Sequence, residues 1–100
     1  MIIVREIFTA KPGEAGKLAK LFKKTMGKQP RTRVMTDLVG PYNTVIMESE
    51  MDSLADFAKV MEDYKKGKPD PNWSEADMKE MEQYKEMYQT GRREIFQITE

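Results

Sequence analysis

Residues 2–10 (IIVREIFTA) decide the fold, because β-branched and aromatic side chains dominate this stretch and predict a β-strand. Successive side chains of a strand point to opposite faces of a sheet, so Ile3 and Ile7 share one face while Val4 and Phe8 share the other. A strand with apolar groups on both faces needs a cover on both faces. The rest of the chain, or a partner, must supply these two covers.

An amphipathic helix and a hairpin are expected after this strand. Lys11-Pro12-Gly13 interrupts the strand, and residues 14–26 then carry apolar side chains at helical spacing, with lysines around the remaining surface. Residues 32–39 and 44–51 are predicted as two further strands, and Gly40-Pro41-Tyr42-Asn43 between them has the length of a hairpin turn. The first half of the chain therefore has the predicted order β-α-β-β.

The second half is expected to add two helices and a last strand. Asp52 or Ser53 caps one helix, Ser74 opens another that runs to Gly91, and residues 92–99 (RREIFQIT) form the strand. The whole order predicts an α+β fold of the ferredoxin-like split β-α-β type, with a four-stranded antiparallel sheet and an extra helix before the last strand. Right-handed crossovers place both main helices on one face of the sheet, so the other face is expected to need a partner.

Composition narrows the possible functions. One hundred residues are expected to form a single domain over residues 1–100. Lysine and arginine total 17 and so do aspartate and glutamate, so we expect no nucleic-acid partner, because such proteins carry a basic excess. The chain has no cysteine and no histidine, and we therefore expect no metal, no cofactor and no thiol or imidazole catalysis. Without an apolar run of membrane-spanning length, we expect no membrane partner and a cytoplasmic location.

Four segments carry a family resemblance: the strand that ends at Lys11-Pro12-Gly13, the amphipathic helix with Phe22, the hairpin over 32–51 and the Gly-Arg-Arg-Glu-Ile-Phe strand at 91–96. Together they resemble the dimeric α/β-barrel superfamily, and within it the NIPSNAP-like and antibiotic-biosynthesis-monooxygenase-like proteins. The resemblance implies a homodimer in which two four-stranded sheets pack face to face. It also implies a cavity between helices and sheet, which some members use for cofactor-free oxidation, haem breakdown or isomerisation. The haem-dependent branches need a histidine ligand, which this chain lacks.

Charged residues inside the predicted strands are the first candidates for a site. In a ferredoxin-like sheet the first strand lies between the third and the last, so we expect Arg5 to meet Glu48 or Glu94. An arginine–carboxylate cluster in a cavity could bind an anionic substrate or polarise a carbonyl group. The alternative is a structural ion pair at a sheet edge or a dimer interface, which contributes little stability.

Aromatic side chains of the second half are the second group of candidates: Tyr64, Trp73, Tyr84 and Tyr88. Trp73 belongs to the proline-containing stretch 67–73, which is expected to lie over a helix–sheet cavity, and the tyrosines could offer hydroxyl donors to a flat ligand. The alternative is that Trp73 plugs the hydrophobic end of the domain and that the tyrosines cover the inner face of the third predicted helix.

These observations favour a small-molecule-binding, homodimeric α/β-barrel protein with a helix–sheet cavity that is either non-catalytic or of unassigned activity. The candidate ligand-binding residues are Arg5, Glu48, Tyr64, Trp73, Tyr84 and Tyr88. The alternative function is a cofactor-independent monooxygenase or isomerase that acts on a small aromatic or polyketide-like substrate. The missing histidine and cysteine weigh against acid–base and covalent catalysis, and the sequence does not identify a ligand.

Overall fold

The computed structural model of the chain describes residues 1–27, 29–67 and 74–100. The elements follow the predicted class order, with a short 3-10 helix, η1, added before the last strand. Their bounds are β1 Ile2–Ala10, α1 Ala15–Thr25, β2 Thr32–Thr36, β3 Thr44–Met51, α2 Leu54–Lys65, α3 Glu75–Met81, η1 Glu82–Glu86 and β4 Tyr88–Gln97.

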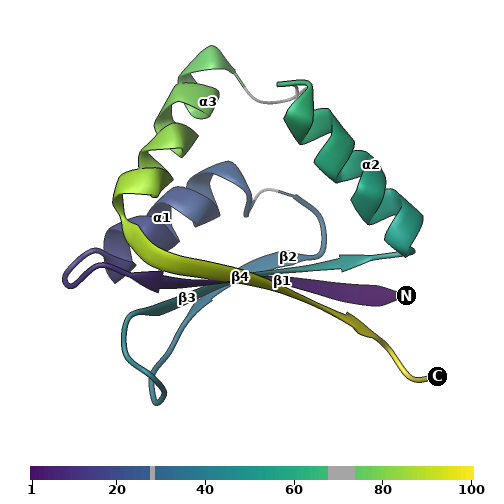
Figure 1. The fold of residues 1–100 in the computed structure, drawn as a ribbon, viewed down its shortest axis with the longest axis horizontal. Coiled ribbons are helices and arrows are strands. Elements are labelled where there is room, and N and C mark those ends of the chain that lie inside the picture. Colours follow the sequence, from purple (N-terminus) through teal and green to yellow (C-terminus); the bar gives the residue numbers. More distant parts are fainter. Residues whose placement is uncertain (28, 68–73) are drawn as a thin grey trace.

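The four strands form one antiparallel sheet in the order β2-β3-β1-β4. Figure 1 shows that α1, α2 and α3 all lie on the same side of this sheet. We call this side the helix face and the opposite side the open face. The architecture confirms the predicted α+β, ferredoxin-like fold, with β1 in the centre between β3 and β4.

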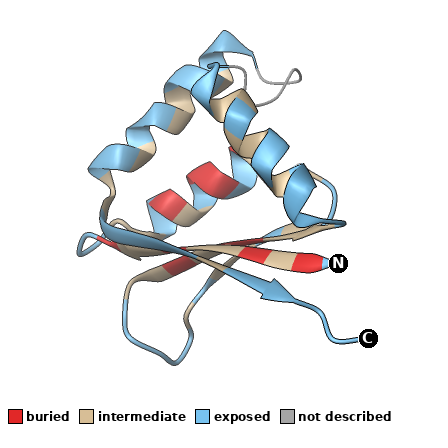
Figure 2. Cartoon of the chain, turned by 45° about the vertical axis from the view of Figure 1, so that its right-hand side comes forward, coloured by how far each residue is buried: buried red, intermediate tan, exposed pale blue. Residues whose placement is uncertain are grey.

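The core lies between α1 and the helix face. Leu18 and Phe22 on α1 are completely buried, and they form one cluster with Ala10, Val45 and Met47 from the strands beneath. Figure 2 shows the buried residues gathered on α1 and the central strands, whereas α2 carries none. The helix face is therefore well covered by α1, and covered less tightly by α2.

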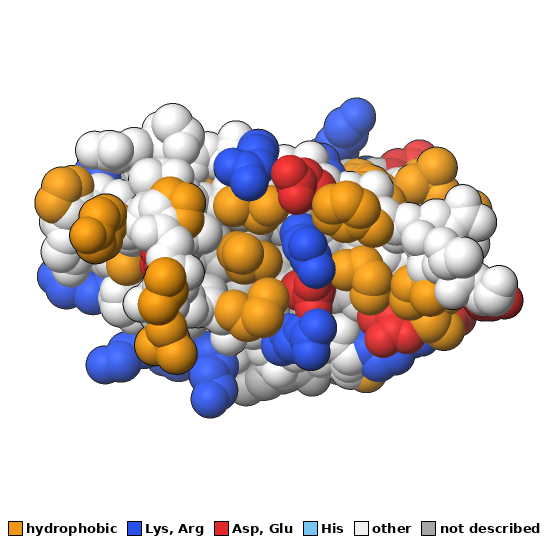
Figure 3. Space-filling view, turned by 90° about the horizontal axis from the view of Figure 1, so that it is seen from below, with side chains coloured by type: hydrophobic (Ala, Val, Ile, Leu, Met, Phe, Trp, Pro, Cys, Tyr) orange, Lys and Arg blue, Asp and Glu red, His pale blue; other side chains and the backbone are white. Residues whose placement is uncertain are grey.

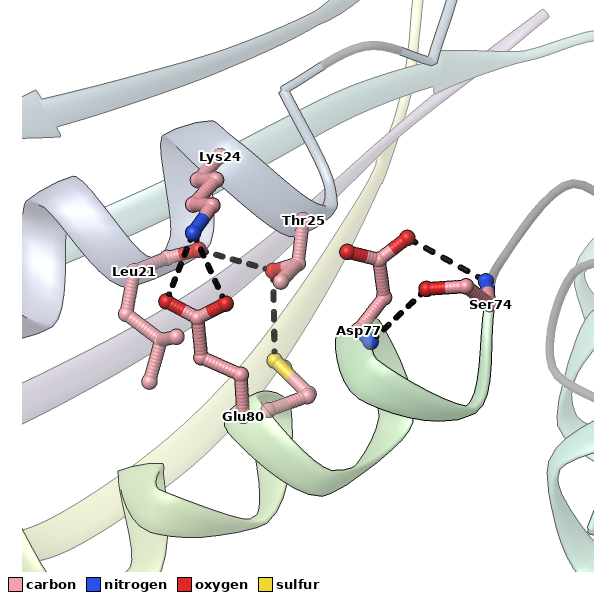
Figure 4. Close-up of polar contacts among 7 residues, drawn as sticks. Leu21, Lys24, Thr25, Ser74, Asp77 and Glu80 are labelled. Carbon is pink, nitrogen blue, oxygen red and sulfur yellow. Dashed lines mark hydrogen bonds and ion pairs between the residues drawn. The ribbon is translucent and has the colours of Figure 1, made fainter.

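Polar contacts tie α1 to α3 at one end of this core (Figure 4). The Lys24 ammonium group lies 2.9 Å from the Glu80 carboxylate, and the Thr25 hydroxyl, which also donates to the Leu21 carbonyl oxygen within α1, lies 3.3 Å from the Met81 sulfur of α3. The helix α3 begins with a capping box, in which Ser74 and Asp77 each accept a hydrogen bond from the other's backbone amide. These contacts orient the helix that leads into β4.

Two predicted element bounds are wrong. The third helix was expected to run to Gly91, but α3 ends at Met81 and β4 already begins at Tyr88. A β-bulge between Thr9 and Ala10 explains the early start, because it sets Tyr88 opposite Ala10 on the helix face. The sheet pairing therefore overrides the helical spacing of the local sequence.

The second wrong bound concerns β2, which ends at Thr36 instead of continuing to residue 39. The Asp37 side chain accepts a hydrogen bond from the Thr44 amide and closes the ladder at that point. Leu38 and Val39 consequently lie in the connecting loop, where each is 98% exposed. Local hydrophobicity predicted a strand there, but no strand is available to pair with these residues.

Candidate functional site on the open face

A row of alternating charges crosses the open face. Arg33 of β2 pairs with Glu48 of β3, Glu48 pairs with Arg5 of β1, and Arg5 pairs with Glu94 of β4. Directly opposed residues of neighbouring strands share one face, so these four side chains form one continuous line. We call them the charge row, and Figure 3 shows it as a column of alternating blue and red between hydrophobic side chains.

Glu48 is the centre of the charge row and is only 3% exposed. Its two carboxylate oxygens accept hydrogen bonds from the Nε atoms of Arg5, at 2.7 Å, and Arg33, at 2.5 Å. Burial by itself would raise the pKa of Glu48, but the hydrogen bonds and positive charges of the two arginines outweigh it and lower this pKa below its ordinary value. Glu48 is therefore a carboxylate at neutral pH, neutralised by two guanidinium groups.

Apolar side chains flank the charge row on both sides. Ile3 and Phe96 form a pair in the next register position toward the N-terminus of β1, and the Arg5 guanidinium lies 5.2 Å from the centre of the Phe96 ring. On the other side of the row, Ile7 pairs with Ile46. Phe96 is 47% exposed, so the open face presents substantial apolar surface to its surroundings.

A pocket of about 250 Å³ opens at the β2 side of this face. Its lining consists of Ile3, Arg31, Thr32, Arg33, Glu48 and Glu50. Arg31 forms an ion pair with Asp52 at 3.1 Å, and Arg33 forms one with Glu48. Among the residues that the structure describes, Glu50 forms no ion pair, so its carboxylate can accept hydrogen bonds from a bound molecule.

The structure places two of the predicted site residues in this region. Arg5 and Glu48 meet as expected, as an ion pair between β1 and β3. Arg5 also lies opposite Glu94 in the pairing of β1 with β4. The Glu94 carboxylate, however, accepts a hydrogen bond from Arg92 of its own strand, at 3.3 Å. The pocket beside Glu48 lies on the open face, whereas the sequence predicted a cavity between helices and sheet.

Tyr84 and Tyr88 lie on the opposite face of the sheet. Their rings stack with centres 5.6 Å apart, and both pack against Phe8, whose ring in turn contacts Phe22 of the core. The arrangement matches the alternative reading that these tyrosines fill the space beneath η1. Their predicted role as ligand donors stays a prediction, as does the helix–sheet cavity.

The two remaining candidates are apart from both groups. The Tyr64 hydroxyl donates to the Met26 sulfur at 3.2 Å and so joins the ends of α2 and α1. Trp73 belongs to the stretch 67–73 that was expected to lie over a cavity, and residues 68–73 of this stretch lie outside the described residues. The predicted residues that the structure describes thus lie in several places, and among them only Glu48 lines the pocket, with Arg5 as its ion-pair partner.

The sequence analysis counted Arg33 and Glu50 among the charged residues of the predicted strands, but it did not place them, or Arg31, among the ligand-binding residues. Their spacing gives a signal that could have found them, because residues two apart in a strand share a face and Glu50 follows Glu48 at this interval. It also missed a charged pair on the helix face, where the Arg93 Nε donates to Glu6 at 2.5 Å and the guanidinium lies 5.2 Å from the Phe57 ring centre. This ion pair lies on the helix face of the sheet, beneath α2.

In residues 1–27, 29–67 and 74–100, no group of three acidic side chains is arranged to hold a metal ion. Within the same ranges, no helix combines the length and the apolar character needed to cross a membrane.

Comparison with known proteins shows the fold. No family model and no curated protein matches the chain. Among solved structures, an uncharacterized NIPSNAP domain protein from Burkholderia xenovorans is 13% identical, with a TM-score of 0.71 over 99% of this chain and 95% of the other. A NIPSNAP family protein from Agrobacterium tumefaciens is 14% identical, with a TM-score of 0.75 over 98% and 85%. The predicted NIPSNAP-like fold is therefore confirmed.

Proposed function

We propose that this chain, which has the fold of NIPSNAP domain proteins, is a homodimer that binds a small polar molecule in the open-face pocket without converting it. The observation that carries the proposal is the 250 Å³ pocket itself, which lies beside the buried Glu48 and has in its wall the Glu50 carboxylate, for which the described residues provide no ion-pair partner. Pockets of this kind combine an apolar surface with a few polar groups that fix a ligand. Here Ile3 supplies the apolar surface.

The apolar surface of the open face supports the homodimer. Phe96 is 47% exposed, and none of the three helices lies on this side of the sheet. Leu38 and Val39 are each 98% exposed in the loop between β2 and β3, and this loop extends on the open side of the sheet (Figure 1). A second copy packed against the open face would remove these groups from water, and it would enclose the pocket at the same time.

The charges of the pocket indicate the kind of ligand. The two arginines are already neutralised by Asp52 and Glu48, whereas Glu50 forms no ion pair among the described residues. A molecule with an ammonium group or another strong hydrogen-bond donor would therefore satisfy the site best. The volume lies just below the usual range for ligand sites, which limits the ligand to a small metabolite.

The protonation and pairing of the charged groups favour a pocket that binds its ligand without catalysing a reaction. Because two guanidinium groups lower the pKa of Glu48, this carboxylate holds no proton to donate at neutral pH, and it is a weak base. Arg33 and Glu48 satisfy each other's hydrogen bonds. The pocket lining contains neither histidine nor cysteine, since the chain has none.

A thermal-shift screen with small amines, amino acids and carboxylates tests the ligand site. We expect a hit to raise the melting temperature of the wild type and of Glu86→Gln, an exposed control on η1, but not that of Glu50→Gln. A hit that stabilises Glu50→Gln equally would place the ligand elsewhere. Oxygen consumption or a new product in the presence of the hit would favour the cofactor-independent monooxygenase or the isomerase instead.

Light scattering at micromolar concentration tests the homodimer. We expect a particle of twice the 11.6 kDa chain mass for the wild type and for Gln97→Glu, which adds a charge to β4 on the helix face. Phe96→Glu adds the same charge to the open face and should give monomers that remain folded by circular dichroism. A monomeric wild type would refute the homodimer.

A further inference from the structure

The charge row leaves one positive charge in excess beside the pocket. Glu48 is a single carboxylate but pairs with two guanidinium groups, those of Arg5 and Arg33. Glu94 lies opposite Arg5 but accepts a hydrogen bond from Arg92, so it does not supply the missing negative charge. Arg33 contacts Glu48 through Nε and Nη2, and its side chain is 70% exposed, so its Nη1 amino group is placed to donate to a second carboxylate.

The matching negative charge lies two residues further along β3. Glu50 lines the pocket and forms no ion pair with any residue that the structure describes. Its amide donates to the Arg31 carbonyl oxygen at 3.0 Å, but the Arg31 guanidinium pairs with Asp52 instead of Glu50. Because Glu48 lies opposite Arg33, Glu50 and Arg33 are diagonal neighbours on the open face, a relation that separates residues by about 7–8 Å.

We propose that the open-face pocket binds an α-amino acid with an apolar side chain, whose carboxylate lies on Arg33 and whose ammonium group lies on Glu50. The two charged groups of such a molecule are attached to one carbon atom. A hydrogen bond of about 2.8 Å at each end lets them bridge diagonal neighbours of opposite charge. The inference rests on the ligand site of the proposed function and names the class of its ligand.

Ligands of other charge types fit this wall less well. A primary amine satisfies Glu50 but leaves the excess positive charge at Arg33 without a partner, and a monocarboxylate does the reverse. A phosphate or a dicarboxylate brings additional negative charge toward Glu48 and Glu50, which disfavours binding. A site that forms hydrogen bonds with both groups discriminates against a molecule that lacks either, because one protein group then stays unsatisfied.

The apolar side chain of the ligand has its own place in the pocket. Ile3, which lines the pocket, lies beside Glu50 in the pairing of β1 with β3, and Phe96 lies on the other side of Ile3. Figure 3 shows apolar side chains next to the charge row on this face. The volume of about 250 Å³ limits the ligand side chain to a few carbon atoms. Each methylene group that packs on this surface strengthens binding about threefold.

Nuclear magnetic resonance titration of the isotope-labelled protein with three molecules of one alkyl chain tests the charge pairing. Norvaline carries both charged groups, butylamine lacks the carboxylate and pentanoate lacks the ammonium group. We expect norvaline to shift the amide signals of Arg33 and Glu50 and to bind at least tenfold more tightly than either analogue. Affinity should also rise from glycine through alanine to norvaline as the apolar side chain grows.

Two variants assign the contacts to single residues. Arg33→Gln should weaken the binding of norvaline at least tenfold and leave that of butylamine unchanged, whereas Glu50→Gln should weaken norvaline equally and leave pentanoate unchanged. A merely structural role would weaken all three molecules alike. Arg92→Gln, on the open face but outside the pocket lining, is the matched control and should bind norvaline like the wild type. Circular dichroism shows whether each variant is folded, and the three molecules on the wild type decide the outcome if one is not.

The possible results separate this inference from the proposed function. Butylamine that binds the wild type as tightly as norvaline, and is lost in Glu50→Gln, would overturn the amino-acid ligand while the ligand site stands. Pentanoate that binds as tightly as norvaline would overturn the role of Glu50 in both. No shift of the pocket amides with norvaline would overturn the amino-acid ligand, and the site would then stand or fall with the thermal-shift screen.

Discussion

Glu48→Gln should reveal how much stability the centre of the charge row contributes. The amide oxygen can still accept from one arginine, but the amide nitrogen brings a donor against the other guanidinium donor, so one of the two charge-assisted hydrogen bonds is lost. Removing one member of a fully buried ion pair costs about 3–5 kcal/mol. Arg5 and Arg33 are 42% and 70% exposed and can turn to water, which lowers the expected loss to about 2 kcal/mol.

The lowered pKa of Glu48 determines how this stability loss changes with pH. The folded state lowers the pKa of Glu48, so the unfolded chain binds a proton more readily than the folded chain, and ionised Glu48 stabilises the fold. This contribution is fully present above the ordinary pKa of the carboxyl group and is lost as the pH falls through the lowered folded-state value. The difference in stability between wild type and Glu48→Gln should therefore shrink in acid, because protonated Glu48 is also uncharged.

Thermal unfolding at fixed protein concentration measures both effects. At pH 7 a loss of about 2 kcal/mol lowers the melting temperature of a domain of this size by roughly 10 °C. Glu86→Gln removes one exposed carboxylate from η1 and should leave the melting temperature almost unchanged. Equal melting temperatures of Glu48→Gln and wild type at pH 7, or a difference that persists undiminished at pH 3, would refute the reasoning.

Substitutions at three further positions probe the contacts that hold the sheet and its helices together. Gly91→Val should destabilise the fold by roughly 1–3 kcal/mol in chemical denaturation, because a β-carbon there lies 3.2 Å from two ring atoms of Phe8. Ser74→Ala should cost about 1 kcal/mol, since the Asp77 amide loses its side-chain acceptor, and Ser74→Asp should keep wild-type stability. Thr25→Val keeps the shape of a buried side chain but removes its hydroxyl donor, and it should cost about 1 kcal/mol by the same assay.

The local sequence correctly predicts the elements in which the spacing of apolar residues agrees with the packing of the folded chain. β1 and β3 have the predicted bounds, because both combine β-branched residues with clear breaks at their ends. The helices α1 and α2 also lie where apolar spacing predicts them, and Ser53 caps α2 by accepting from the Asp56 amide. For these segments the sequence preference and the final packing coincide.

The start of β4 could not be predicted from local sequence. Met78, Met81 and Tyr84 have helical spacing, and this spacing continues to Tyr88. In the folded chain Tyr88 nevertheless pairs with Ala10, which is far away in sequence, and its ring packs edge-on against Phe8. The bulge that permits this contact has no marker in the residues around it, so the boundary depends on a partner strand.

The candidate site was only partly predictable for a related reason. Strand alternation correctly brought Arg5 and Glu48 together, but it could not tell which face of the sheet the helices cover. The face became clear only from packing, because Phe8 contacts α1 through Phe22 and thereby directs Arg5 to the other side. The pocket also depends on Arg31, which precedes β2 and belongs to no predicted element.

The charge row and the core impose the same strand register. A slip of β3 by one residue against β1 would set Met47 or Ser49 opposite Arg5, and it would turn Glu48 onto the helix face. There the carboxylate would occupy the layer in which Met47 now packs with Phe22, without a guanidinium partner, at a cost of several kcal/mol. Because the slip would also lift Met47 out of the core, polar and apolar interactions disfavour it together. The charge row therefore helps to fix the strand register of the sheet.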